Sequence, residues 1–344
     1  MKAISASARL KIQVASVCFL VLAAPLLQSA YAQTDSNWQK IVAAAKKEGK
    51  VSLYYQAVPA VMGRMIKDFE TAYPEIKVEG IRQLGGIQSL AKIIEERQAG
   101  IDGADVSQYA LSTWHRDHAA TNSFLKPVGP AATNWPSPHL PYGTVTVYAA
   151  FPFVLAYNTN LVKTPITGIR DILRPEFQGK LGTTDVIAET TIAWYEWLEK
   201  TQGPDFLAKF AAQKPKLFYG SVPGTQSLSA GEIAFLPYTV QAITNPMVAQ
   251  GAPIKVVLTN PSFASSDAMV VLAWAKRPNA GLVFLDYFMS RRGQTVLTGG
   301  GDFASPLSGI PGSLDMKAMN SWDPMKYPPE VTKPYIEKWN KLFK

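Results

Sequence analysis

The feature that most constrains this chain is an alternation of short apolar strand patterns with helix-length segments. Residues 51–55 are aromatic, apolar and β-branched like a strand, and apolar residues recur at helical spacing over 62–69. Residues 76–81 predict a second strand, 90–94 a second helix and 105–106 the end of a short third strand. Strands separated by helices of this length predict parallel βαβ units.

A proline-rich passage over 127–141 separates this block from a second one. Because proline cannot donate to a β-ladder, we expect this passage to be a surface connection. A long extended stretch over 145–157 then opens the second α/β block. Further strands are expected over 216–219, 233–236, 255–258 and 269–273, and helices over 192–198, 206–210, 282–289 and 335–343. A length of 344 residues agrees with two domains.

The first thirty-two residues are typical of a secretory signal peptide. They combine a basic start without acids, an apolar run over 12–27 and the small-x-small site Ala30-Tyr31-Ala32. The run is shorter than the ~20 residues that a membrane-spanning helix needs. We therefore predict cleavage near Ala32 and export to the periplasm. Cys18 lies inside the run and follows Val17, where a lipoprotein signal requires a small residue, so we expect it to be lost with the signal.

Composition excludes several function classes. A mature chain without cysteine has no disulfide framework and no cysteine-based metal site. Loss of the signal leaves 31 basic against 26 acidic residues, spread along the chain, whereas nucleic-acid binding needs basic residues gathered on one face. We therefore expect no nucleic-acid partner. The chain has no G-x-S-x-G or H-E-x-x-H motif and only three histidines. Paired carboxylates leave a periplasmic enzyme open as an alternative.

Six short motifs are spread along nearly the whole mature chain. They lie, in chain order, at 38–51 (WQKI and AKKEGKV), 69–76 (FE and YPEI), 157–162 (YNTNLV), 175–182 (PEFQGKLG), 230–234 (AGEIA) and 288–294 (FMSRRGQ). In this order they resemble the periplasmic solute-binding proteins of ABC importers. The resemblance is to family 1 extracellular solute-binding proteins, in their iron(III)/spermidine-type branch.

The resemblance implies an α/β, type II periplasmic binding protein fold. Two lobes would be joined by a two-stranded hinge and would close on a ligand in the cleft between them. Lobe one would comprise 33–147 and 259–320, lobe two 148–258, and a C-terminal helical tail 321–344. The implied function is a monomeric receptor, without a cofactor, that delivers a small solute to an ABC permease in the inner membrane. A sensory binding partner of a membrane kinase would share this fold.

Candidate ligand-binding residues follow from position. Ligands in open parallel sheets bind at the carboxyl ends of strands, where helix N-termini offer unpaired N–H groups. The candidates in the first block are Tyr55, Gln56, Arg82, Gly86, Ser107 and Tyr109, and those from the later stretches are Tyr148, Thr190, Ser221 and Tyr238. Together with the helix N-termini, these residues favour an anionic organic solute such as a carboxylate, phosphonate or sulfonate.

Each candidate has a structural alternative. The pair Gly85-Gly86 is equally explained by a tight turn, and Thr190 and Ser221 by helix capping. Arg82 is either a solvated surface residue or a bidentate clamp for an acidic group. Tyr148 and Tyr238 are compatible with a hinge or core position as well as with the cleft.

Ferric ion is the alternative ligand of the same fold. It prefers hard anionic oxygens, and iron-binding relatives supply a tyrosine pair where this chain has the single Tyr238. Tyr54 and Tyr55 are neighbours on a strand and point to opposite faces. His115 and His118 are three residues apart on a predicted helix without further ligands nearby. We therefore predict no metal site. A polyamine would need several acids, for which the candidates are Asp185, Glu189 and Asp267.

Overall fold

The computed structural model describes residues 36–83, 87–186 and 188–344, so the predicted signal peptide and Gly86 lie outside the described residues. The chain is helical over 36–48. The strands are β1 (Lys50–Tyr55), β2 (Lys77–Arg82), β3 (Val106–Ala110), β4 (Thr146–Asn158), β5 (Gly182–Thr184), β6 (Lys216–Phe218), β7 (Phe235–Val240), β8 (Ile254–Val257), β9 (Ser262–Val271) and β10 (Met319–Ser321).

Helices alternate with these strands. The α-helices are α2 (Pro59–Ala72), α3 (Ile87–Gln98), α4 (Thr113–Ala120), α5 (Pro130–Thr133), α6 (Glu189–Gln202), α7 (Phe206–Ala212), α8 (Ser221–Ser229), α9 (Gln241–Ala249), α10 (Pro278–Met289), α11 (Arg291–Thr298) and α12 (Pro329–Phe343). Short 3-10 helices are η1 (Ser137–His139), η2 (Pro141–Gly143), η3 (Ile169–Leu173), η4 (Pro175–Phe177), η5 (Met316–Ala318) and η6 (Pro324–Lys326).

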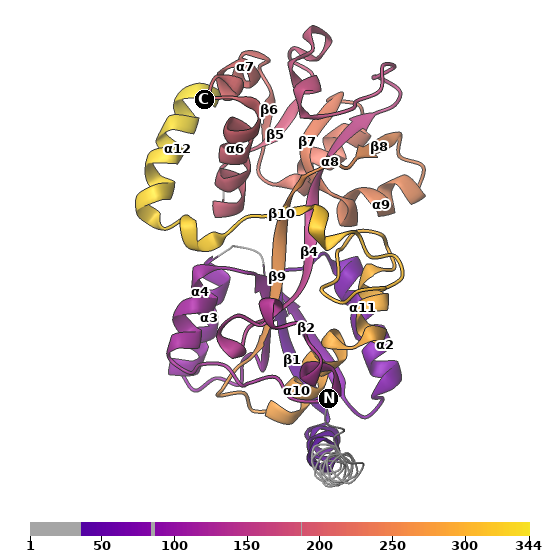
Figure 1. The fold of residues 1–344 in the computed structure, drawn as a ribbon, viewed down its shortest axis with the longest axis vertical. Helices are drawn as coiled ribbons and strands as arrows, with labels where there is room; N and C mark the ends of the chain where they lie inside the picture. The colour runs from indigo at the N-terminus through magenta and orange to yellow at the C-terminus, as the bar shows by residue number, and fades with distance from the viewer. Residues whose placement is uncertain (1–35, 84–86, 187) are drawn as a thin grey trace, which may run out of the picture.

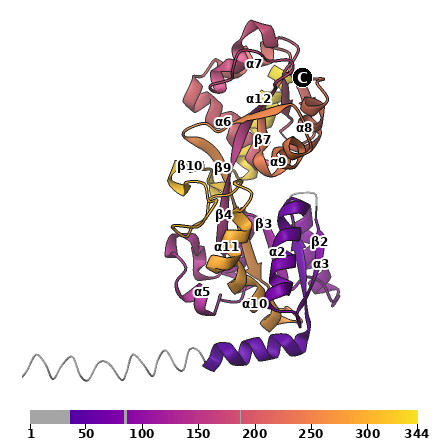
Figure 2. The same ribbon diagram turned by 90° about the vertical axis from the view of Figure 1, so that its right-hand side faces the viewer.

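Two lobes lie one above the other, with β4 and β9 running between them (Figure 1, Figure 2). Lobe one contains the strand order β2-β1-β3-β9-β4, and lobe two contains β7 and β8 beside the upper half of β4. The lower half of β4, from Thr146 to Pro152, pairs with β9, whereas Phe153 to Asn158 pair with β7 and β8. These two long strands are the two-stranded hinge that the resemblance implied.

Strand direction is parallel within each α/β unit and antiparallel where the chain changes lobe. β1 is parallel to β2 and β3, and β5 is parallel to β6, as the strand–helix alternation predicted. The sequence predicted no direction for the linking strands: β9 is antiparallel to β3 and β4, and β4 is antiparallel to β7 and β8. β9 carries the chain back from lobe two, so it must run against the strand that carried it there.

Each lobe has its own apolar core. The core of lobe one is built around Phe284, whose ring contacts Phe69 edge to face and Phe288 at a tilt. In lobe two, fully buried Tyr195 packs against Trp339 of α12. Because α12 contacts α6 and α7, the C-terminal helix contributes to the lobe-two core.

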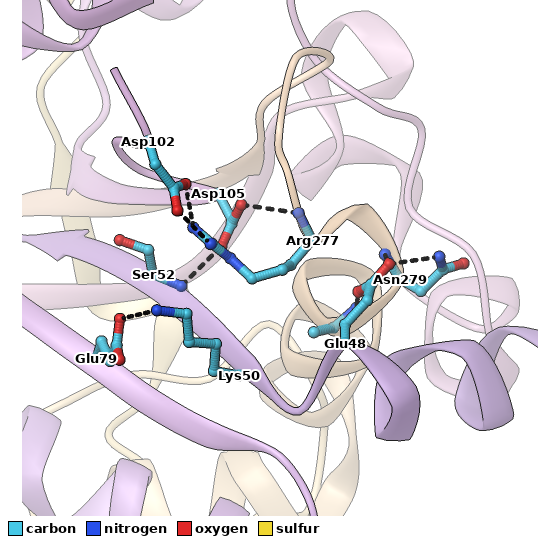
Figure 3. Close-up of polar contacts among 9 residues, drawn as sticks. Glu48, Lys50, Ser52, Glu79, Asp102, Asp105, Arg277 and Asn279 are labelled. Atoms are coloured by element: carbon cyan, nitrogen blue, oxygen red, sulfur yellow. Dashed lines mark hydrogen bonds and ion pairs between the residues drawn. The ribbon is translucent and has the colours of Figure 1, made fainter. Parts of the chain in front are cut away.

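The amino ends of the lobe-one strands are closed by a polar cluster (Figure 3). Buried Asp105 accepts hydrogen bonds from the Ser52 amide at 2.8 Å and from Arg277 Nε at 2.6 Å. The two Nη atoms of Arg277 bind Asp102 at 2.7 and 2.8 Å. Glu48 accepts from the Ala280 amide at the start of α10. At this end of the sheet, polar groups of different segments therefore hydrogen-bond one another and stabilise the fold.

Three strands differ clearly in extent from the sequence prediction, and one of them, β7, ends at Val240 instead of residue 236. β3 begins where the sequence predicted the third strand to end, and β9 begins at Ser262, before the predicted 269–273. The cause is the polar residues inside these buried strands, notably Gln108, Ser265 and Asp267, which interrupt the apolar pattern. As a result Ser107 and Tyr109, expected to follow the third strand, lie within β3.

Candidate functional site: a cleft between the lobes

A cleft of about 260 Å³ lies between lobe one and lobe two, at the carboxyl ends of β1 and β3. Both hinge strands contribute side chains to its wall. It is lined by Gln56, Ala57, Val58, Ala110, Phe151, Phe153, Thr184, Ala188, Thr190, Thr191, Gly220, Ser221, Tyr238, Val240, Ala242, Ser265, Asp267, Asp302 and Phe303.

Four helices begin at this cleft. Their N-cap residues, Val58 before α2, Ala188 before α6, Gly220 before α8 and Val240 before α9, all line it. None of these side chains has an oxygen that could accept a hydrogen bond from the first turn of its helix. The Val61 and Thr191 amides already donate to the Val58 and Ala188 carbonyls at 3.0 Å. The remaining N–H groups of these first turns and the positive end of each helix dipole are left for another acceptor. Gly220 has a φ of 104°, a left-handed conformation that favours glycine.

Some of the predicted site residues come together here. Gln56, Thr190, Ser221 and Tyr238 all line the cleft. The Tyr238 ring stacks on Phe153 with ring centroids 4.2 Å apart, which fixes an aromatic surface where β4 enters lobe two. The Gln56 side chain lies at the end of β1, and its backbone amide donates to the Gln108 carbonyl at 3.1 Å.

Other predicted residues are placed away from the cleft wall. Tyr55 packs against the lobe-one core, and Arg82 is exposed at the end of the edge strand β2. Ser107 and Tyr109 are buried within β3, and Tyr109 packs in a second lobe-one cluster. Tyr148 is buried beside Phe288. Arg82 therefore does not contribute a cation to the cleft wall.

Tyr148 reaches the site indirectly, through Asp267. Pairing of Val147 with Ala268 and of Ala149 with Asp267 leaves Tyr148 as an extra residue in a β-bulge. Its hydroxyl donates to Asp267 Oδ2 at 3.2 Å. The Asp267 side chain lines the cleft although the residue is only 5% exposed. Burial raises the pKa of Asp267 to about 7, and the bond from Tyr148 opposes that rise.

Asp302 is a second carboxylate in the wall, but it is already neutralised. Arg64 Nη2 donates to its two oxygens at 3.0 and 3.3 Å, and the same guanidinium binds the carbonyls of Val296 and Leu297. Burial raises the pKa of Asp302, and Arg64 opposes that rise. The Arg64–Asp302 pair therefore fixes the wall next to α11.

Thr184 offers an unused polar atom on the lobe-two side. This residue ends β5, is 2% exposed and lines the cleft. Its carbonyl accepts from the Tyr195 hydroxyl at 2.7 Å, but its own Oγ1 has no hydrogen-bond partner among the residues that the structure describes. A buried hydroxyl without a partner is costly, so a ligand that binds it gains that interaction.

Gln56 was predicted as a site residue because it follows a strand. Thr190 and Ser221 were predicted because they lie where a helix begins. Phe151, Phe153, Ser265 and Asp267 were not proposed as site residues from the strand-end rule. They alternate along the hinge strands, so a period of two starting from one cleft residue would have indicated the others.

The histidine pair on α4 lies in lobe one, packed beside Trp114. Burial lowers the pKa of His115 to about 3, and the His118 ring contacts the Trp114 carbonyl. In the described ranges, no three His, Cys, Asp or Glu side chains gather closely enough to hold a metal ion. The lining residues that the structure describes also include no Lys, Arg or His.

A known protein family matches this fold and cleft. The model of the bacterial extracellular solute-binding proteins matches residues 52–301, which is most of the chain. The chain belongs to this family. The protein therefore binds a solute, and its two lobes and the cleft between them are those of a solute-binding protein. No curated protein matches the sequence significantly.

Solved structures show the same two-lobed architecture. A substrate-binding protein of an ABC transporter from Agrobacterium tumefaciens has a TM-score of 0.73 and 18% identity, over 87% of this chain and 96% of that one. AfuA from Actinobacillus pleuropneumoniae, with fructose-6-phosphate bound, has a TM-score of 0.66 and 18% identity, over 86% and 98%. Iron-bound HitA from Pseudomonas aeruginosa has a TM-score of 0.63 and 18% identity, also over 86% and 98%.

Two of these similar structures hold different ligands, fructose-6-phosphate and iron. The likeness therefore shows the fold and does not identify the ligand of this chain. The wall of its cleft is made of aromatic rings, hydroxyl groups, helix N-termini and two carboxylates. Among the described helices, none is both long and apolar enough to span a bilayer.

Proposed function

We propose that this solute-binding protein is the periplasmic receptor of an ABC importer and captures a small anionic organic solute in its cleft. The observation that carries the proposal is the meeting of four uncapped helix N-termini around one pocket. Unpaired N–H groups and aligned dipoles stabilise negative charge without any cationic side chain. The acidic group of the solute would lie on the lobe-two side, at α6 and α8.

In this proposal the side chains have separate roles. Thr184, Thr190 and Ser221 donate hydroxyl hydrogen bonds to the acidic group. Tyr238 and Phe153 provide an apolar surface for the body of the solute, and Gln56 binds it from lobe one. Because these residues come from both lobes, one bound solute would hold the lobes together.

Delivery would follow from closure about the hinge. A solute that bridges both lobes shifts the population toward a closed form, and the closed form docks on the permease in the inner membrane. We propose 33–147 with 259–320 as lobe one, 148–258 as lobe two and 321–344 as the C-terminal tail. The receptor acts as a monomer without a cofactor, after cleavage near Ala32, and releases the solute chemically unchanged.

The ferric alternative has less support from the cleft wall. Tyr238 is the single tyrosine in the described wall, and Asp302 is already paired with Arg64. Hard anionic ligands for ferric ion are therefore few.

An enzyme would need an activated nucleophile or an acid–base pair, whereas in the described wall Asp302 is paired with Arg64, so Asp267 has no second free carboxylate beside it. A sensory partner of a membrane kinase would use the same binding chemistry, and capture of the permease separates the two roles.

A thermal denaturation screen of short carboxylates, sulfonates and phosphonates tests the proposal. We expect at least one of these classes to raise the melting temperature and to give a saturable calorimetric isotherm. Ser221→Ala should weaken that binding several-fold, because one hydrogen bond to a charged group is lost. Ser229→Ala is the matched control, since Ser229 ends the same helix away from the cleft. No stabilisation by any of these classes, or recovery of a chemically altered solute, would contradict the proposal.

A further inference from the structure

The two walls of the cleft differ in electrostatic character. On the lobe-two side α6 and α8 present uncapped N-termini, together with the unpartnered hydroxyl of Thr184. On the hinge side β9 presents the carboxyl group of Asp267. A solute that carries only negative charge matches the first wall and is repelled by the second one once Asp267 is ionised.

Asp267 is the carboxyl group that is free to recognise a ligand. Asp302 is paired with Arg64, whereas in the described part of the chain Tyr148 is the only side chain that hydrogen-bonds Asp267. Its neighbours on the adjacent strands are Ala110 of β3 and Ala149 of β4, which carry no charge. A buried carboxylate with one neutral donor lacks the counter-charge that such groups normally have.

Aromatic rings lie on the same side of the cleft. Phe151 and Phe153 both belong to β4, the strand next to β9, and both line the cleft. Phe153 lies flat on Tyr238, and Phe151 packs at a steep angle against Phe303. Aromatic faces attract cations, and this attraction grows when water is excluded. The hinge wall therefore combines an acid with rings that favour positive charge.

From this asymmetry we propose that the solute is zwitterionic: its acidic group binds the helix N-termini of lobe two, and Asp267 binds an ammonium group at its other end. The inference rests on the proposed function and narrows its solute class to short amino acids of the carboxylate, sulfonate or phosphonate type. Asp267 is thereby a specificity-determining residue, which separates these solutes from their analogues without an amino group.

The number of protons released or taken up on binding shows whether an ammonium group or an acidic group lies beside Asp267. Tyr148 on β4 contacts Asp267, and Gln108 on β3 contacts the Tyr148 side chain. The Arg64–Asp302 pair lies in the same wall. Because burial raises the pKa of Asp267 to about 7, part of the free protein carries a proton on this group at neutral pH. An ammonium group favours its ionised form, so binding releases a fraction of a proton. A solute that placed an anion beside Asp267 would instead take up a proton.

The decisive experiment compares taurine with ethanesulfonate, which differ by the amino group and whose sulfonates stay ionised at every pH used. Calorimetry of the wild-type protein in buffers of different ionisation enthalpy measures affinity and proton exchange together. We expect taurine to bind at least about tenfold more tightly, with proton release, and to gain affinity from pH 6 to pH 8. β-Alanine with propionate, and 2-aminoethylphosphonate with ethylphosphonate, repeat the comparison for the other acidic groups.

Variants locate the effect. Asp267→Asn should remove the preference for the amino compound and its proton release. It should strengthen binding of the analogue without an amino group at pH 8, because the repelling carboxylate is gone. Asp286→Asn is the matched control: Asp286 is equally buried at 5% exposure, but it accepts from the Ala131 and Ala132 amides away from the cleft. Tyr148→Phe is a milder variant. It removes the bond that lowers the pKa of Asp267, so taurine affinity should fall at pH 7 and recover at higher pH.

The outcomes separate the two proposals. Analogues without an amino group that bind as tightly as the amino compounds would overturn the zwitterion inference and leave the anionic-receptor proposal standing. Proton uptake on taurine binding, or an unchanged preference in Asp267→Asn, would also overturn the inference. If no member of the three pairs binds, both the anionic solute class and the inference fail.

Discussion

Two buried aspartates at opposite ends of the lobe-one sheet have different environments. Asp105, at the amino ends of the strands, accepts from Ser52 and twice from Arg277 (Figure 3). Asp267, at the cleft, accepts from Tyr148 alone among the described side chains. The first carboxylate is satisfied within the protein, and the second has bonding capacity left over. The comparison indicates that the base of the lobe stabilises the fold and the cleft end keeps its polar groups for a ligand.

Substitution of the satisfied aspartate should have the largest effect on stability. Asp105→Ala leaves the Ser52 amide, the Arg277 amide and Arg277 Nε without their buried acceptor, while Asp102 keeps its pair with the guanidinium. We expect a loss of about 3–5 kcal/mol in the free energy of unfolding. Urea denaturation measures this loss. Solute affinity of the folded fraction should stay unchanged. A variant as stable as the wild type would show that the cluster at the base does not stabilise the fold.

Substitution of the unsatisfied aspartate should change stability in the opposite direction. The pKa of Asp267 is raised to about 7 in the folded protein, so the ionised group disfavours folding as pH rises from about 4 through 7. Asp267→Asn removes this cost and should stabilise the protein at pH 8 by up to about 4 kcal/mol, but little at pH 4. Melting temperatures across this pH range test the sign, and a stabilisation that is larger at pH 4 would contradict it.

A smaller effect is expected at Thr184. Thr184→Val replaces the unpartnered hydroxyl by a methyl group of similar shape, so stability should stay level or rise by about 1 kcal/mol. Solute affinity should nevertheless fall several-fold. Thermal denaturation with and without solute measures both quantities. A loss of stability without any change in affinity would show that the hydroxyl serves the fold.

The smallest change in stability is expected from a substitution in the exposed ion pair beside the Asp105 cluster. Lys50 and Glu79 pair at 2.9 Å with half-exposed side chains (Figure 3). Exposed ion pairs contribute about 0–1 kcal/mol, so Lys50→Met should change the melting temperature by a few degrees at most and solute binding not at all. A loss as large as that of Asp105→Ala would mean that exposure does not separate these two pairs.

Sequence reasoning predicted the local structure because the local pattern determines it. The strand–helix alternation located β1, α2, β2 and α3, and the strand-end rule found Gln56, Thr190 and Ser221 in the cleft wall. Each of these residues lies at the end of an element whose apolar period is visible in the sequence. Position along the chain was enough to place them.

The sequence did not reveal what depends on contacts between distant segments. No local pattern indicates that Tyr148 lies in a bulge opposite Asp267, because the bulge arises from pairing between β4 and β9, whose residues there are more than a hundred positions apart. The exposed edge position of Arg82 depends on which strand lies outermost. Both facts come from strand order and register, which a single sequence pattern leaves open.

Solution X-ray scattering tests the central claim, that a solute bridges the two lobes, most directly. With a saturating concentration of the tightest-binding amino compound, the wild-type radius of gyration should decrease, and the decrease should follow the calorimetric binding curve. Tight binding with an unchanged radius of gyration would contradict the account, because the solute would then occupy one lobe without drawing in the other.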